Sequence, residues 1–359
     1  MLKTRNLIIL AVVLLALLGV RLVLDRDHDR SVNRAGVDTL LPEDLTAEDL
    51  GSVVVGFGDD EEALVLERHP DGWVVATAWD SRASEQRIDS LLDGLSGLGG
   101  EFRSDSPAVL ADYGFTDSTT VRITGRDPQG QEVFAIEVGR KPERAVGNFV
   151  RRPGDDRVYL ASRPVLANLG IHGAEPQAPQ SRQFLDLQLQ QLDRQEVDAI
   201  ALYTPDGTVK LRKEFAEPAA VAGDAAAGDA ATDGVGFAPG EPGRGVWEWR
   251  LAEPRSEPAA KTRADAVLGA VTSVRASDVA DPDADLATYG LAEPERRAVV
   301  ELTGGRTVTL AFGDRREAAE GATAGVYAQV EGEDTVWVVS EYVVNNIFKS
   351  RDDLVPPQS

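Results

Sequence analysis

Hydrophobic and polar positions alternate in a sequence of short patterns between residues 50 and 171. Apolar runs at 52–57, 63–67 and 73–77 are separated by Gly-Asp-Asp and Pro-Asp-Gly, which is typical of antiparallel strands joined by tight turns. An amphipathic helix is predicted over 84–98, because apolar residues recur there at helical spacing. Four further strands and a short helix are predicted at 120–124, 132–138, 148–152, 157–161 and 163–169.

The same order of patterns recurs about 176 residues later. At that offset Arg87-Ile88-Asp89 aligns with Arg263-Ala264-Asp265, and Tyr113-Gly114-Phe115 aligns with Tyr289-Gly290-Leu291. At an offset of 178, Val158-Tyr159-Leu160 aligns with Val336-Trp337-Val338. Two copies are too few for a solenoid, so we expect duplicated domains. The predicted class is α+β, with an N-terminal transmembrane helix, two duplicated domains of mostly antiparallel sheets, and flanking helices.

The pattern also predicts where the domains begin and end. We expect a first repeat domain over 50–171 and a second over 196–349, joined by a linker and connecting helix over 172–195. A charged tether is expected over 25–49 and a tail over 350–359. Residues 216–245 are rich in Ala, Gly and Asp and carry almost no large apolar side chains, so we predict a disordered insert within the second domain.

The first 24 residues predict a membrane anchor. Residues 7–20 are an unbroken apolar run that spans only ~21 Å as a helix, and residues 7–24 reach ~27 Å if Arg21 extends toward the membrane surface. A cleaved signal peptide and a buried soluble helix are the alternatives, but no small-x-small cleavage site follows the run. Lys3 and Arg5 favour a cytoplasmic N-terminus, which predicts a single-pass protein with most of the chain outside the cytoplasm.

Composition excludes several classes of function. The chain has 60 acidic and 37 basic residues, giving a net charge of −23, which disfavours binding to nucleic acids or anionic lipid surfaces. The absence of cysteine excludes disulfides, thiolate metal sites and a cysteine nucleophile. Only three histidines are present, and they are far apart in the sequence. We therefore expect no metal site and no cofactor.

Asp89 and Asp265 are carboxylates that the two copies share. They are candidates for acid–base catalysis or cation binding. The structural alternative, which we favour, is that each begins its helix and accepts free backbone N–H groups there. Thr262 and Asp265 even have the spacing of a capping box.

Tyr113-Gly114 and Tyr289-Gly290 are the second shared pair. A glycine that follows a short helical turn favours a left-handed cap, with the tyrosine packed under the turn. A pair of tyrosines that contact a ligand is the functional alternative. These four residues are candidates for interactions, but we favour a structural role for them.

Other chemical motifs are weak. Trp73, Trp249 and Trp337 alternate with polar neighbours as core positions of strands do, although a sugar-binding platform is an alternative. Residues 278–285 hold four aspartates without the glycine and terminal glutamate of a calcium loop, so we expect a solvated loop. The sequence contains no GxSxG, SxxK or HExxH motif, and we predict no catalytic residues.

An ordered series of residues in the second copy resembles a known family. It comprises a Trp, then Ala264-Asp265 opening a helix, Tyr289-Gly290-Leu291, a strand ending in Gly313, then Tyr327 and Val336-Trp337-Val338. This order is similar to the domain-of-unknown-function 4340 family of membrane-anchored bacterial proteins. Members are often encoded beside ABC transporter components of the gliding-motility type, and the family carries no established catalytic residues.

The resemblance implies a non-enzymatic accessory or interaction protein of an ABC-type export or motility system. Its partner would be an ABC permease or a related envelope membrane protein, and its place the bacterial inner membrane with the bulk of the chain in the periplasm. The alternative is a binding module for an envelope glycan, peptide or lipid in the cleft between the domains.

Overall fold

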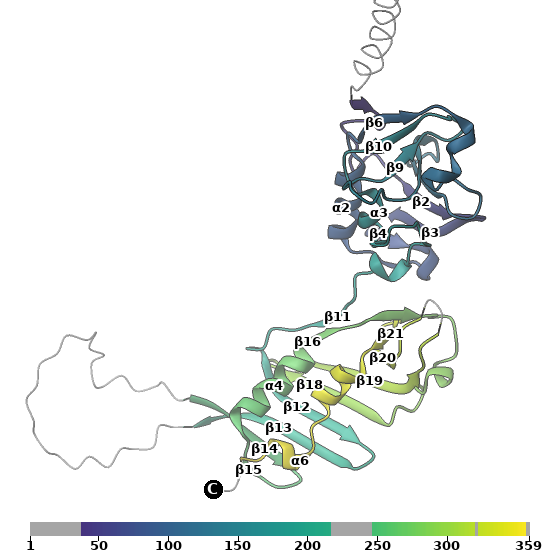
Figure 1. Ribbon diagram of the computed structural model, residues 1–359. Helices are drawn as coiled ribbons and strands as arrows, with labels where there is room; N and C mark the ends of the chain where they lie inside the picture. The colour runs from purple at the N-terminus through teal and green to yellow at the C-terminus, as the bar shows by residue number, and fades with distance from the viewer. Residues whose placement is uncertain (1–36, 217–245, 320–321, 357–359) are drawn as a thin grey trace, which may run out of the picture. The chain divides into compact units, whose positions relative to one another are not determined.

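The computed structural model describes residues 37–216, 246–319 and 322–356. They divide between Asp186 and Leu187 into two compact units, called unit 1 and unit 2 below (Figure 1). The anchor expected over 1–24 and most of the insert expected over 216–245 lie outside these residues. None of the helices in the described part of the chain is long and apolar enough to cross a membrane.

Unit 1 is built on one antiparallel sheet of ten strands in the order β1-β6-β10-β9-β8-β7-β2-β3-β4-β5. Helices α2 (Glu85–Leu95) and α3 (Val165–Asn168) accompany it. The strands are β1 (Val37–Thr39), β2 (Ser52–Phe57), β3 (Asp60–His69), β4 (Gly72–Val75), β5 (Ser81–Arg82), β6 (Gly99–Ser104), β7 (Val121–Arg126), β8 (Glu132–Val138), β9 (Phe149–Arg151) and β10 (Val158–Ala161).

Unit 2 has a nine-stranded antiparallel sheet in the order β15-β14-β13-β12-β18-β19-β20-β21-β17, and a two-stranded sheet of β11 and β16. Its helices are α4 (Lys261–Thr272), α5 (Glu341–Ile347) and α6 (Arg351–Leu354). The strands are β11 (Gln188–Gln191), β12 (Val197–Thr204), β13 (Gly207–Ala216), β14 (Val246–Glu253), β15 (Glu257–Pro258), β16 (Ser273–Arg275), β17 (Asp278–Ala280), β18 (Arg296–Leu302), β19 (Thr307–Arg316), β20 (Gly325–Val330) and β21 (Val336–Val339).

The nine strands of the unit 2 sheet match nine of the ten strands of the unit 1 sheet when one strand order is read from its other end. From β5 to β6 in unit 1, each strand has a counterpart in the same place between β15 and β17 in unit 2. The pairing of β1 with β6 has its counterpart in the pairing of β11 with β16. The duplication predicted from the sequence is therefore a duplication of the whole sheet.

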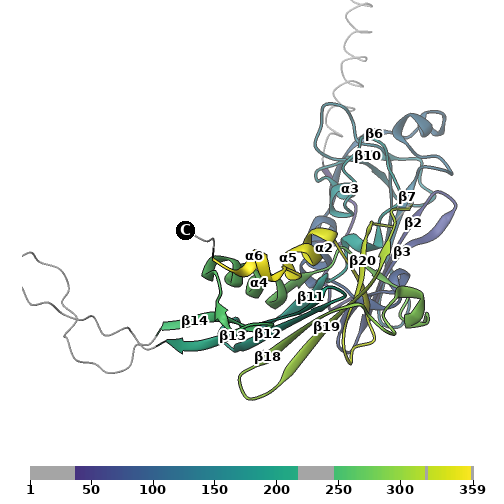
Figure 2. The ribbon, with the colours of Figure 1, turned by 90° about the horizontal axis from the view of Figure 1, so that it is seen from below.

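Each unit buries one face of its long helix against its sheet. Helix α2 buries Ile88, Leu91, Leu92 and Leu95, as the helical spacing of these residues requires. Helix α4 buries Ala264, Val267, Leu268 and Val271. Figure 2 shows α4, α5 and α6 along the same side of the unit 2 sheet.

Many predicted elements agree with the structure. The strands expected at 52–57 and 132–138 have the observed bounds of β2 and β8. The helix expected at 84–98 is α2, which is shorter at its C-terminal end because Ser96 has left the helical conformation.

The connecting helix expected within 172–195 is wrong. Residues 181–183 form a short 3-10 turn, η4 (Ser181–Gln183), and Gln188–Gln191 form strand β11, which pairs with β16. Leucines at 185, 187 and 189 recur with the period of a strand, and Gln188, Gln190 and Gln191 pair with residues of β16.

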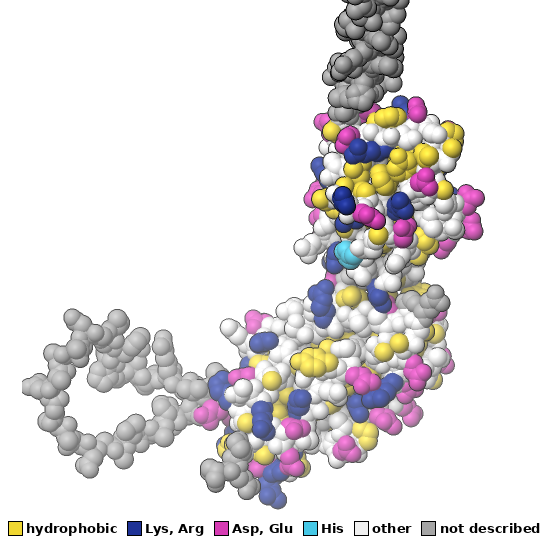
Figure 3. Space-filling model, viewed as in Figure 1, with side chains coloured by type: hydrophobic (Ala, Val, Ile, Leu, Met, Phe, Trp, Pro, Cys, Tyr) yellow, Lys and Arg dark blue, Asp and Glu magenta, His cyan; other side chains and the backbone are white. Residues whose placement is uncertain are grey.

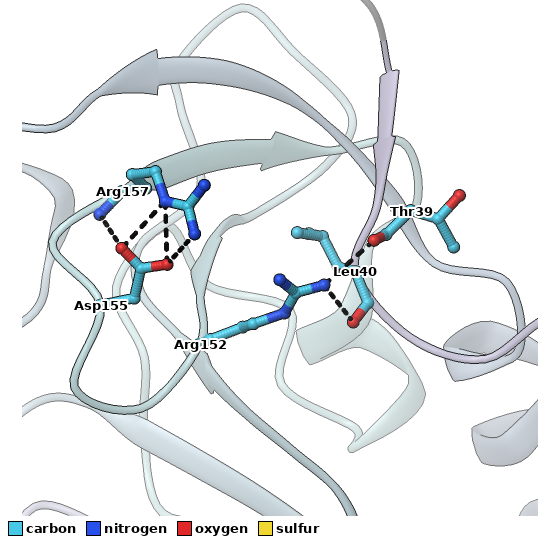
Figure 4. A network of polar contacts seen from close by, with 5 residues as sticks. All are labelled: Thr39, Leu40, Arg152, Asp155 and Arg157. Atoms are coloured by element: carbon cyan, nitrogen blue, oxygen red, sulfur yellow. Dashed lines mark hydrogen bonds and ion pairs between the residues drawn. The ribbon is translucent and has the colours of Figure 1, made fainter.

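The charged tether expected over 25–49 extends too far into the first unit. Residues 37–39 form β1, which pairs with β6, and Leu40, Leu41 and Leu45 are buried. Arg152 holds this segment, because its guanidinium donates to the carbonyl oxygens of Thr39 (3.2 Å) and Leu40 (3.4 Å) (Figure 4). The segment belongs to the core of unit 1, but acidic residues between its leucines give it the composition of a charged tether.

Candidate functional site

Asp89 and Asp265 do not begin their helices. Helix α2 begins at Glu85 and α4 at Lys261, so each aspartate lies four residues into its helix. Asp265 forms an ion pair with Lys261 (2.8 Å) on the exposed side of α4, and Asp89 is exposed. The structure does not bring the two carboxylates into one unit. The capping box expected at Thr262 is also absent.

The Tyr-Gly pairs occupy matching turns. Gly114 and Gly290 adopt the predicted left-handed conformation, with φ of 86° and 66°. The Tyr113 ring lies 4.6 Å from that of Phe149, and the Tyr289 ring lies 4.6 Å from that of Tyr327, measured between ring centroids. The tyrosines thus pack under their turns, as expected for a structural role.

A second glycine supports each turn. Gly139 and Gly313 pass so close to the tyrosine turn that a β-carbon would collide with the carbonyl oxygen of Tyr113 and Tyr289, respectively. Gly139 follows β8, whereas Gly313 lies inside β19 where the register with β20 shifts. Each Tyr-Gly turn therefore packs closely against the chain at or just after a central strand, at Gly139 in unit 1 and at Gly313 in unit 2.

Tyr289 is more deeply buried than Tyr113. It is buried in a cluster with Ala280, Leu291, Ala311 and Val336, and its hydroxyl donates to the carbonyl oxygen of Asp281 (3.0 Å). Burial raises the pKa of the Tyr289 phenol above its ordinary 10.0, and the negative charge of Asp281 adds to the shift.

Each unit also contains a buried ion pair that the sequence analysis missed. In unit 1 Glu137 lies between Arg151 (2.6 Å) and Arg122 (3.5 Å). In unit 2 Asp278 pairs with Arg316 (3.0 Å). Asp278 is not part of a solvated loop, because it is buried in β17 at the edge of the sheet. The arginines that pair with these acids are distant in sequence, so no local motif predicts the ion pairs.

The tryptophans behave as core residues where their side chains are described. Trp73, Trp249 and Trp337 are buried, as predicted. Trp79 is 48% exposed and has a positive φ of 56°. Because Trp73, Trp249 and Trp337 are all buried, they do not form an exposed aromatic platform.

A groove lies beside α5 in unit 2. It consists of two adjoining hollows of about 200 and 430 Å³ that share Arg296 and Asn345. Gly290 and Arg315 line the smaller hollow. We call the two hollows together the α5 groove, and it contains one predicted candidate, Gly290.

The larger hollow combines apolar walls with positive charge. Leu202, Val209 and Phe348 supply apolar surface between the β12–β13 turn and the segment that joins α5 to α6. Three cationic side chains and one carboxylate line it as well: Arg296, Lys349, Arg351 and Asp206. The positive charge is confined to this hollow, because Glu295, Asp314 and Glu341 line the smaller one beside Arg296 and Arg315.

Two of these cations have no carboxylate partner. Arg351 pairs with Glu257 (2.5 Å), but within the described part of the chain Arg296 and Lys349 form no ion pair. Acidic and basic side chains are otherwise interspersed over the faces of both units that Figure 3 displays. Across residues 37–216, 246–319 and 322–356, no three histidine, aspartate or glutamate side chains gather closely enough to hold a metal ion.

Comparison with protein families supports the resemblance seen in the sequence. The family model described as "Domain of unknown function (DUF4340)" matches residues 73–225 and 249–358. The chain belongs to the DUF4340 family. The two matched segments start at Trp73 and Trp249, which occupy corresponding positions in β4 and β14. No curated protein and no solved structure shows significant similarity to the chain.

The DUF4340 match thus extends over both units. It includes all six candidate residues, Asp89, Tyr113, Gly114, Asp265, Tyr289 and Gly290. In the structure the Tyr-Gly pairs organise the end of each sheet, and only Gly290 lines the α5 groove. The groove's cations were not singled out from the sequence, because Arg296 and Lys349 belong to no motif and are 53 residues apart.

Proposed function

We propose that this DUF4340 protein is a membrane-anchored, extracytoplasmic accessory protein that acts by binding a partner of an ABC-type export or motility-like system. The single observation that carries the binding role is the α5 groove of unit 2, whose larger hollow combines apolar walls with two cations, Arg296 and Lys349, that form no ion pair with a described residue. Grooves of this kind orient a ligand through a few polar groups and hold it through apolar contact.

The anchor and the location are supported by the sequence. The apolar run at 7–20 follows two basic residues and is too continuous for an ordinary surface helix. A tethered protein with two rigid sheet units can hold a partner close to the membrane without catalysing a reaction. The ABC permease as partner rests on the gene neighbourhood that is typical of the family.

A crosslinking experiment in cells tests this proposal. A photoreactive residue replaces Tyr342, which is 75% exposed on α5 beside the groove, in the full-length protein. The matched control carries the same residue at Arg306, which is exposed in the turn between β18 and β19. After solubilisation of the membranes, mass spectrometry identifies the crosslinked protein.

Recovery of an ABC permease or its membrane partner from the Tyr342 variant, and not from the Arg306 variant, is the expected result. Crosslinks only between copies of this chain, or to envelope polymers, would contradict the accessory role. A parallel fractionation compares the full chain with a variant that lacks residues 1–24. If both are equally soluble without detergent, the anchor is wrong.

A further inference from the structure

The same end of the sheet is built differently in the two units. In unit 1 Leu64 of β3 and Val121 of β7 are 0% exposed at this end. The strand registers match them to Val209 of β13, which is half-buried, and Arg296 of β18, which is exposed. Both residues of unit 2 line the larger hollow of the α5 groove. The second copy therefore has an open, charged wall where the first has buried apolar side chains.

The segment that follows the last helix is also shorter in unit 2. In unit 1 the backbone N–H of Ser84 donates to the carbonyl oxygen of Phe184 (2.7 Å), and in unit 2 Ala260 donates in the same way to Leu354 (2.7 Å). Phe184 lies 16 residues after the end of α3, but Leu354 lies only 7 residues after the end of α5. Unit 1 therefore has nine additional residues at this position, and the α5 groove lies along the shorter segment of unit 2.

The α5 groove crosses the ends of neighbouring strands. Glu341 at the start of α5 pairs with Arg315 of β19 (3.3 Å). Arg351 at the start of α6 pairs with Glu257 of β15 (2.5 Å). Between β19 and β15 the strand order is β18, β12, β13 and β14. The chain from α5 to α6 therefore crosses these strands in this order, and the groove follows it from β19 toward β14.

Carboxylates and cations are sorted along the groove. Glu295 and Asp314 line only the smaller hollow, Lys349 lines only the larger one, and Arg296 lies where the two meet. None of these four side chains forms an ion pair with a described residue. Asp206 also lines the larger hollow, where it faces both unpaired cations. The groove thus has an acidic end at β19 and a basic end toward β12.

The acidic and basic ends are separated by about 10 Å. Neighbouring strands lie roughly 4.8 Å apart, so the two steps from β19 to β12 cover about 10 Å. Along α5 the chain from Glu341 to Lys349 rises about 12 Å at roughly 1.5 Å per residue. A single amino acid carries its ammonium and carboxylate on one carbon and cannot reach both ends. Three residues of extended chain span about 10 Å.

We propose that the α5 groove binds a short peptide of about three residues through its two free ends. The N-terminal ammonium lies at Glu295 and Asp314, and the C-terminal carboxylate lies at Arg296 and Lys349. This inference rests on the proposed binding role of the groove and names the chemistry of its ligand. A dipolar ligand fits a groove that carries both signs of charge, because each end of the peptide meets side chains of opposite charge.

The apolar walls favour an apolar residue at the C-terminal end of the peptide. Val209 and Phe348 line the larger hollow, where the carboxylate end lies. The Phe348 ring packs edge-on against the Phe312 ring at 5.2 Å between centroids, which holds this wall in place. An aromatic or branched side chain next to the carboxylate can therefore be held by apolar contact while the charged groups orient it.

The test uses the full-length protein in detergent and the tripeptide Ala-Ala-Phe. Isothermal titration calorimetry measures the affinity of the free peptide, of its N-acetylated form and of its C-amidated form. We expect the wild type to bind the free peptide, and each blocked form to bind about three- to fivefold more weakly, which is the contribution of one partly exposed ion pair. Free phenylalanine should bind at least tenfold more weakly, because it cannot reach both ends.

Two double variants assign the ends of the peptide. Glu295→Gln/Asp314→Asn should weaken the free peptide as much as acetylation does and should leave the affinity of the acetylated peptide unchanged. Arg296→Gln/Lys349→Gln should have the same relation to amidation. Arg306→Gln, in the exposed turn between β18 and β19, is the matched control and should leave every affinity within twofold.

Several results would overturn the proposal. These are no binding of the free peptide by the wild type, equal binding of the free and the doubly blocked peptide, or an equal loss of free and acetylated peptide in the Glu295→Gln/Asp314→Asn variant. The blocked peptides test the wild type itself, so the result does not depend on whether a variant folds. Thermal unfolding confirms the fold of each variant.

The outcome is separable from that of the accessory role. If the peptide does not bind but an ABC partner crosslinks to the Tyr342 position, the accessory function stands and the peptide site fails. If the peptide binds with the expected dependence on its ends but no membrane partner is recovered, the peptide site stands and the accessory function fails.

Discussion

Units 1 and 2 share the order of their strands but differ in how the end of the sheet is closed. The two sheets carry the same tyrosine turn, and in each the tyrosine ring lies 4.6 Å from a second aromatic ring, measured between ring centroids. Nine additional residues after α3 cover unit 1, while the short link from α5 to α6 leaves a groove in unit 2. The difference teaches that a duplicated core can be retained while the segment that follows its last helix changes in length.

The largest expected effect comes from removing the tyrosine rings. Tyr289→Ala should destabilise unit 2 by about 3–5 kcal/mol, because it deletes a buried ring and the hydroxyl bond to Asp281. Tyr113→Ala should cost unit 1 about 2 kcal/mol, since Tyr113 is only half-buried. Chemical denaturation of each variant measures both losses. Unchanged stability of Tyr289→Ala would show that the ring is not part of the core.

Breaking the buried ion pairs should have the next largest effect. Glu137→Gln removes the partner of two arginines at once and should cost about 3 kcal/mol. Asp278→Asn should cost about 2 kcal/mol, because Arg316 keeps its contact with the carbonyl oxygen of Val279. Urea titrations give both values. A larger loss for Asp278→Asn than for Glu137→Gln would reverse this ranking of the two units.

A smaller effect is expected from pH. Since burial raises the pKa of Tyr289 above 10.0, the folded state resists ionisation of this phenol more than the unfolded state does. Its contribution to stability is complete below pH 10 and is lost as the pH rises through the higher folded-state pKa. Tyr289→Phe should therefore flatten the loss of unit 2 stability above pH 10, measured by denaturation at several pH values. An unchanged slope would contradict the assignment.

The smallest expected effect is that of shortening the β13–β14 hairpin. Replacing residues 217–245 by a two-residue turn keeps the last strand pair, Ala216 with Val246, and makes the hairpin similar to β3–β4 of unit 1. The melting temperature should remain within a few degrees, because the insert contains almost no large apolar residues to bury. Loss of cooperative unfolding in calorimetry would show that the insert packs against the unit.

Elements with a clear period were predictable from the sequence. Strands β2 and β8 and helix α2 follow from alternating or helical spacing, and the left-handed Gly114 and Gly290 follow from a glycine after a helical turn. Short edge elements were not predictable. The sequence pattern predicts a helix where β11 lies and a tether where β1 lies, because three or four residues carry too little periodicity and gain their structure from a partner strand.

By itself the sequence determined the duplication, the family, the class of fold and the positions of the tyrosine turns, since all of these depend on residues that recur at fixed spacing. Only the tertiary structure decided which charges are paired. Asp278 and Arg316 are 38 residues apart and meet because β17 and β19 lie in one sheet. It also decided that Val121 is buried in unit 1 while Arg296, at the matching place in the sheet of unit 2, is exposed.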